Sequence, residues 1–133
     1  MDILNTADAL AASFPKVTKE SLESLLQVRF SENGGNEYFT FFTAGATDSV
    51  SGAELRYSKA DGAKKMLILR LHGPSNVSED DVRARYPDLT PSGGPATGLY
   101  LIKKEAWGEI RFGFGDNEGV STLIFDSIEQ EDS

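Results

Sequence analysis

The sequence predicts an α+β domain: a mostly antiparallel sheet of about six to seven strands, with three short helices packed on one face. Two helix-like segments come first, and a third lies between two groups of strand-like segments. Most of the strand-like segments are separated by short turns, which join antiparallel neighbours. A length of 133 residues and a hydrophobic share of 39% suit a single domain, 1–133, with its own core.

Three segments carry the spacing and the end signals of helices. Residues 3–14 place apolar side chains three and four positions apart, and Pro15 marks the end of this segment. Thr18 and Ser78 each precede a further segment, where a hydroxyl can cap the first helical turn. Residues 79–81 are all acidic, which the N-terminus of the third helix favours.

Alternating or aromatic-rich runs predict the strands. They are Tyr38 to Phe42, Ala53 to Tyr57, Met66 to Leu71, Leu99 to Lys103, Trp107 to Phe114 and Ser121 to Asp126, with a short alternation at 28–30. Asp61-Gly62 is the predicted turn of a hairpin between the second and third of these runs. Two stretches rich in glycine or proline, 31–36 and 87–96, are predicted to be a turn and a loop. Residues 129–133 form an acidic tail.

Two halves of the chain resemble each other. ELRY at 54–57 returns 55 residues later as EIRF at 109–112, and Ile68-Leu69 returns as Leu123-Ile124 at the same offset. The capped helices before these runs lie 60 residues apart. Since neither half could bury one sheet face alone, we expect an internal duplication whose halves, about 17–72 and 77–128, share one core.

A capped helix followed by a W-G-x-I-x-F hairpin resembles the tandem units of β-lactamase inhibitor proteins. It also resembles the single unit of the small lipoproteins that serve outer-membrane β-barrel assembly. The resemblance is carried by Val77, Ser78, Val82, Trp107, Gly108, Ile110 and Phe112, with a partial copy at Val17, Thr18, Leu22, Leu55 and Tyr57. The chain lacks the cysteines of both families. The resemblance implies a binding scaffold whose sheet is the working face.

Charge and cysteine content narrow the classes of partner. Asp and Glu number 21 against 13 Lys and Arg, a formal net charge of −8. Such a chain repels phosphate backbones and anionic lipid, so we expect neither nucleic acid nor membrane as partner, and a basic protein instead. The absence of cysteine excludes disulfides and thiolate metal sites. With no basic leader at the start, we expect a cytoplasmic location.

No motif predicts catalysis, a cofactor or a metal, so we expect no catalytic, cofactor-binding or metal-ligating residues. His72, the one histidine, is interpreted as a hydrogen-bonded side chain at a strand end. The acidic residues 79–81 point in different directions on a helix and do not converge on one ion. Gly113-Phe114-Gly115 lies in a strand, where glycine permits a bend or close packing. Trp107 is expected in the core.

Five residues are the predicted contacts with a partner. Glu54 and Glu109 each have an arginine two positions on, Arg56 and Arg111, which lies on the same sheet face. Charge compensation on a solvated face explains this pattern better than the paired carboxylates of a glycosidase. Tyr100 is expected to be exposed, because its two leucine neighbours occupy the opposite face.

Size, acidity, the lack of catalytic motifs and the resemblance together predict a bacterial protein-binding module. The favoured hypothesis is a toxin-neutralising immunity or inhibitor protein that occludes the active site of a basic partner. One alternative is a type III secretion chaperone-like protein, a class that is also small and acidic but usually ends in a long helix. A second is a small-ligand-binding or enzymatic cystatin-like domain, which would need a pocket with convergent polar groups.

Overall fold

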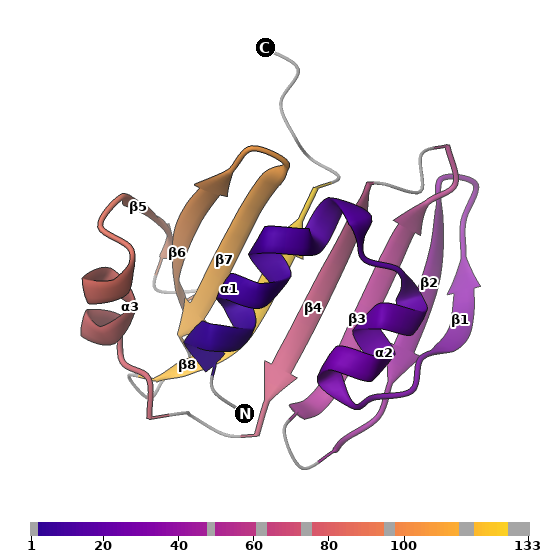
Figure 1. The fold of residues 1–133 in the computed structure, drawn as a ribbon, viewed down its shortest axis with the longest axis horizontal. Coiled ribbons are helices and arrows are strands. Elements are labelled where there is room, and N and C mark those ends of the chain that lie inside the picture. The colour runs from indigo at the N-terminus through magenta and orange to yellow at the C-terminus, as the bar shows by residue number, and fades with distance from the viewer. Residues whose placement is uncertain are drawn as a thin grey trace.

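One antiparallel sheet of eight strands forms one layer of the domain, and helices form the other (Figure 1). The computed structural model describes residues 3–47, 50–60, 64–72, 76–94, 98–114 and 119–127. The helices are α1 (Ile3–Ser13), α2 (Lys19–Leu26) and α3 (Glu79–Arg85), with a 3-10 turn, η1 (Phe14–Lys16), after α1. The predicted α+β class is therefore confirmed, with eight strands in place of six or seven.

The strands form two meanders that meet at the centre of the sheet. They are β1 (Ser31–Gly35), β2 (Phe39–Ala44), β3 (Val50–Ser58), β4 (Lys65–Leu71), β5 (Leu89–Gly94), β6 (Gly98–Glu105), β7 (Gly108–Phe114) and β8 (Val120–Asp126). Their order across the sheet is β1-β2-β3-β4-β8-β7-β6-β5. Each meander thus ends in a strand, β4 or β8, that pairs with the last strand of the other.

The strands that the sequence did not predict are the two edges of the sheet. β1 occupies the stretch that was expected to be a turn, and β5 lies within the stretch expected to be a loop. Residues 28–30, expected to form a strand, have no regular structure. Glycine and proline have low strand propensity. An edge strand tolerates them because only one of its two sides needs hydrogen bonds to a neighbouring strand. The predicted Asp61-Gly62 turn and the acidic tail at 129–133 lie outside the described residues.

Both predicted helix caps are confirmed, and each is a reciprocal capping box. The Thr18 hydroxyl accepts a hydrogen bond from the Ser21 amide at 3.1 Å, and the Ser21 hydroxyl oxygen accepts one from the Thr18 amide at 2.8 Å. Ser78 and Asp81 repeat the arrangement at the start of α3, at 3.1 and 3.0 Å. The acidic run at 79–81 therefore serves the start of this helix, as the sequence predicts.

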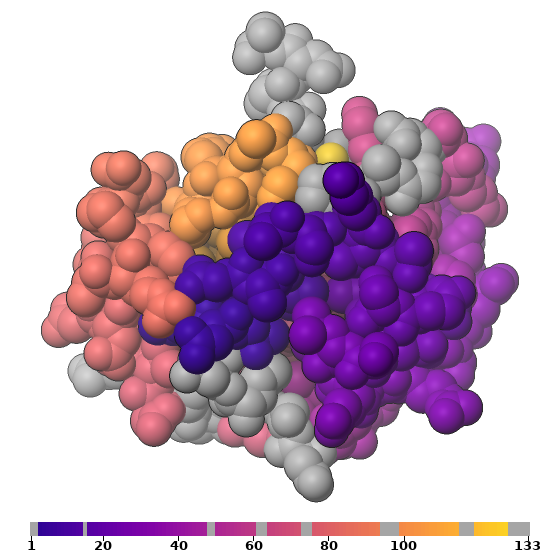
Figure 2. Space-filling view, viewed as in Figure 1, coloured from indigo at the N-terminus to yellow at the C-terminus, as the bar shows by residue number. Residues whose placement is uncertain are grey.

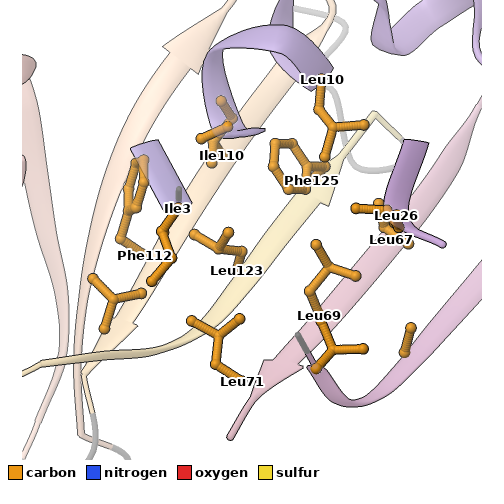
Figure 3. Packing of buried hydrophobic residues seen from close by; sticks show 14 of the residues in the cluster. Ile3, Leu10, Leu26, Leu67, Leu69, Leu71, Ile110, Phe112, Leu123 and Phe125 are labelled. Atoms are coloured by element: carbon orange, nitrogen blue, oxygen red, sulfur yellow. The ribbon is translucent and has the colours of Figure 1, made fainter. Parts of the chain in front are cut away.

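The core lies between the helices and one face of the sheet (Figure 3). The helices contribute Ile3 and Leu10 from α1 and Leu26 from α2, while the central strands contribute Leu67, Leu69, Leu71, Ile110, Phe112, Leu123 and Phe125. Each of these large side chains stabilises the fold by roughly 1.5–3 kcal/mol relative to an exposed position. Burial alternates along β4 and over 109–112 of β7, so every second residue there lies on the other face of the sheet.

Helix α1 precedes the first meander but packs on the second. Asp8 accepts hydrogen bonds from the Tyr86 hydroxyl and from Arg85 Nη2, both at 2.5 Å, which joins α1 to the end of α3. Trp107 Nε1 donates to the carbonyl oxygen of Ala11 at 2.9 Å. Trp107, which the sequence predicts in the core, packs against the core but is only half-buried. These contacts explain why α1 lies over the second meander, whereas α2 lies over the first, in Figures 1 and 2.

The two halves share one order of elements, since α2 precedes β1 to β4 and α3 precedes β5 to β8. The offset of 55 residues matches Leu55 of β3 with Ile110 of β7, and both are buried. It fails in β4 and β8, where it matches the half-buried Ile68 with the buried Leu123. This part of the alignment does not hold, and the duplication itself stays a prediction.

Gly108, the first residue of β7, has a φ of 154°, and a Cβ there would lie 2.1 Å from the carbonyl oxygen of Asp126. We expect Gly108→Ala to lower the free energy of unfolding by at least about 2 kcal/mol, because the backbone must move. Chemical denaturation measures the change. The matched control is Gly52→Ala in β3, whose Cβ would lie 3.7 Å from the Ala44 oxygen and should cost under about 1 kcal/mol. Equal losses would contradict the close approach at Gly108.

Candidate functional site: the open face of the sheet

The predicted contact residues lie on the sheet face opposite the helices. Leu55 is buried towards the core, so its neighbours Glu54 and Arg56 lie on the other face. The same alternation in β7 places Glu109 and Arg111 there. We call this surface the open face and define it by Glu54, Arg56, Met66, Ile68, Arg70, Tyr100, Ile102, Lys104, Glu109, Arg111, Thr122, Ile124 and Asp126. Helices α1 and α2 cover the opposite side (Figures 1 and 2).

Strand register arranges the side chains of the open face in rows. One row joins Arg56, Met66, Asp126 and Glu109 across β3, β4, β8 and β7. The next row joins Glu54, Ile68, Ile124 and Arg111 across the same strands. With strands about 4.8 Å apart, the charges on β3 and β7 lie roughly 14 Å from each other, on either side of the central pair of strands.

The charges on β3 form an ion pair within the strand. Arg56 Nη2 lies 2.5 Å from Glu54 Oε2, and the guanidinium lies 5.4 Å from the centre of the Phe41 ring. The side chains are 22% exposed for Glu54 and 40% for Arg56. This is the charge compensation that the Glu-x-Arg spacing predicts.

The charges on β7 belong to a longer network. Glu109 Oε2 accepts from Arg111 Nε at 2.5 Å, and Glu109 Oε1 pairs with Lys104 Nζ at 2.9 Å. Arg111 Nη2 also lies 2.7 Å from Asp126 Oδ2, and the Asp126 side chain is 1% exposed. A buried carboxylate destabilises the fold unless it is paired with a positive charge. The ion pair with Asp126 therefore fixes the position of the Arg111 guanidinium.

The pKa of Glu109 reflects this network. Burial alone would raise it, but hydrogen bonds and positive charge from Arg111 and Lys104 outweigh the burial. The pKa of Glu109 is therefore lower than its usual value of 4.5, and the carboxylate stays ionised at neutral pH.

Tyr100 lies on the open face but is half-buried, whereas the sequence predicts an exposed side chain. Its cross-strand partner is Gly113, over which the Tyr100 ring lies: a Cβ there would be 2.8 Å from Tyr100 Cε1. The close packing expected at Gly113 is confirmed, while Gly115 lies outside the described residues. In the described part of the chain, the large apolar side chains with high exposure are Tyr38 at 64% and Leu25 at 49%, and neither belongs to the open face.

The acidity of the chain is not found on the open face. Its charged residues are the cations Arg56, Arg70, Lys104 and Arg111 and the carboxylates Glu54, Glu109 and Asp126. Over all described residues, 13 acidic and 13 basic side chains balance, so the eight remaining acids fall at positions outside them. A basic partner stays a prediction, and the open face would meet it with charges of both signs.

The centre of the open face was missed in the sequence. Ile68 and Ile124 are cross-strand partners in β4 and β8, both half-buried, with Met66 beside them. The available signal was a pair of strands with apolar residues on both faces, which indicates either two covered faces or an apolar surface. Asp126 was also missed, because only the register places it beside Arg111.

Other candidate groups have structural explanations. His72 Nε2 contacts the carbonyl oxygen of Thr47, which confirms the hydrogen-bonded histidine at a strand end. Within the described ranges, no three His, Cys, Asp or Glu side chains lie close enough to hold a metal ion. A hollow of about 500 Å³ beside α2 is lined by Lys19, Glu23, Ser24, Val28, Arg29 and Phe30. The Glu23 carboxylate in this hollow already accepts a hydrogen bond from the Phe30 amide at 2.7 Å.

No protein-family model, curated protein or solved structure matches the chain. The likeness to inhibitor proteins and assembly lipoproteins accordingly stays a resemblance of motifs. None of the helices in the described ranges has the length and hydrophobicity required to span a bilayer.

Lys104 offers a mild test of the Glu109 network, because its side chain is 72% exposed. We expect Lys104→Met to raise the pKa of Glu109, because the variant loses one hydrogen bond and one positive charge that lower this pKa against the effect of burial. An NMR titration of the Glu109 carboxyl group measures it. A lowered pKa stabilises the folded state above the ordinary pKa, so the variant should be less stable near neutral pH. The difference should vanish as the pH falls through the lowered pKa of Glu109. An unchanged pKa would show that Lys104 does not contact Glu109 in solution.

Proposed function

We propose that this domain binds another protein through the open face, as a toxin-neutralising inhibitor that acts by occlusion. One observation carries the proposal: an aliphatic centre, Ile68 and Ile124, lies between two sets of fixed ion pairs on β3 and β7. Protein interfaces combine an apolar centre with a polar rim in the same way.

The apolar centre can supply affinity, and the ion pairs can supply orientation. Covering Ile68, Ile124 and Met66 removes apolar surface from water, at about 25 cal/mol per Å². Glu54 and Glu109 are already held by Arg56 and Arg111, so little side-chain entropy is lost when a partner contacts them.

A flat sheet face is better suited to covering the active site of a partner than to inserting a segment into it. The open face is built on five neighbouring strands whose ladders fix its side chains in rows. Such a surface can cover the active site of a partner without entering it. The net charge of −8 would speed the encounter with a basic toxin, while the mixed charges of the open face would set the register.

Ile68→Lys tests the proposal. The new amine would lie beside Glu54, its cross-strand partner, so the fold should persist while the apolar centre gains a charge. The reading frame next to this one is expressed alone and together with this chain, and growth is measured. We expect the neighbouring product to be toxic alone, wild type to restore growth, and Ile68→Lys to fail, with binding at least about 30-fold weaker.

Leu25→Lys is the matched control, because Leu25 is 49% exposed on α2, on the other layer of the molecule. It should restore growth as well as wild type does. A harmless neighbouring product, or equal protection by Ile68→Lys, would overturn the proposed function.

A further inference from the structure

We propose that, without its partner, the open face pairs with the open face of a second copy of this chain, about a two-fold axis that runs along the strands between β4 and β8. This inference rests on the proposed function in using the same surface. It concerns a different occupant, which the free protein supplies itself.

The charges around the centre alternate in sign. β3 and β7 run in opposite directions, since three antiparallel pairings separate them. The order Glu-x-Arg is therefore reversed across the sheet. Arg56 and Glu109 share one row, and Glu54 and Arg111 share the next. The four charges thus form a rectangle of roughly 14 Å by about 7 Å in which each side joins opposite signs.

A two-fold rotation about the proposed axis keeps each row in place and exchanges β3 with β7. Arg56 then lies opposite the partner's Glu109, and Glu54 lies opposite the partner's Arg111. At the centre, Ile68 lies opposite the partner's Ile124. The surface is therefore complementary to itself, as a closed dimer with one shared interface requires.

The geometry of packed sheets allows these contacts. Face-to-face sheets lie about 10 Å apart with strands rotated by about 30°. The four charges lie about 7 Å from the axis, one and a half strand spacings, so this rotation moves them by only about 4 Å. An arginine side chain can span that displacement.

When they are buried, the four charges of positions 54, 56, 109 and 111 are all paired, whereas Arg70 would lie opposite the partner's Thr122 and have no acidic side chain across the interface. Each glutamate already forms an ion pair with an arginine on its own strand, at 2.5 Å in both strands. The second copy removes water from these ion pairs but brings an additional opposite charge to each of them. Met66 would lie opposite the partner's Asp126, a carboxylate that is 1% exposed and already paired with Arg111. Long-range repulsion between two chains of net charge −8 is screened beyond about 8 Å at physiological salt.

The double variant Glu54→Arg with Arg56→Glu tests the axis. It keeps the composition, the net charge and the ion pair within β3, but it reverses the signs on that strand only. Each charge on β3 would then face a like charge of the partner. Sedimentation equilibrium should show a dimer for wild type and a dissociation constant at least about 100-fold higher for the variant. Circular dichroism and thermal melting check that the variant is folded.

A second pair of variants tests the centre. Ile68→Lys should also yield a monomer, because it places a charge against the partner's Ile124, whereas Leu25→Lys should stay dimeric. A monomeric wild type would overturn the inference. A dimer that persists in the double variant would overturn the axis, since a two-fold axis across the strands would bring position 54 opposite the partner's position 56 and keep opposite signs together. A dimer that persists in Ile68→Lys would overturn the use of this face.

The outcomes are separable from those of the proposed function. Growth rescue by a chain that is monomeric at every concentration would support the proposed function and exclude self-pairing. A wild-type dimer that is lost in both open-face variants, together with failed rescue by wild type, would support self-pairing and exclude the inhibitor.

Discussion

The antiparallel pairing of β4 with β8 is the contact on which the rest of the structure depends. It joins the two four-stranded meanders into one sheet that the helices can cover. The pairing runs from Met66–Asp126 to Arg70–Thr122. Its helix-facing residues, such as Leu67 and Phe125, lie at the centre of the core. Its outward residues, Ile68 and Ile124, form the centre of the open face. One ladder of hydrogen bonds therefore positions both the stabilising and the candidate binding residues.

Local signals were enough for the elements that depend on neighbours in sequence. Thr18 and Ser78 begin their helices as predicted, because a cap needs only a hydroxyl and an amide three residues later. The period of two likewise placed Glu54 with Arg56, and Glu109 with Arg111, on one face. Strand order and register are non-local, so the rows that join these two pairs could not be predicted.

The errors have the same origin. β1 and β5 were missed because their composition is that of turns, and only the neighbours β2 and β6 make them strands. The exposure of Tyr100 was overestimated because the glycine beneath its ring, Gly113, is 13 residues away in sequence and adjacent only through the register. The aliphatic centre of the open face was missed because the pairing between Ile68 and Ile124 cannot be deduced from the sequence.

The two edges of the sheet limit how the domain can associate. β1 is interrupted by a register shift between Glu32 and Gly35, and Gly34 and Gly35 have positive φ. β5 carries Pro91, which has no amide hydrogen to donate. Neither border is a good template for an added strand, so fibre-like growth by lateral strand addition is disfavoured. We therefore expect association through the open face rather than through either edge of the sheet.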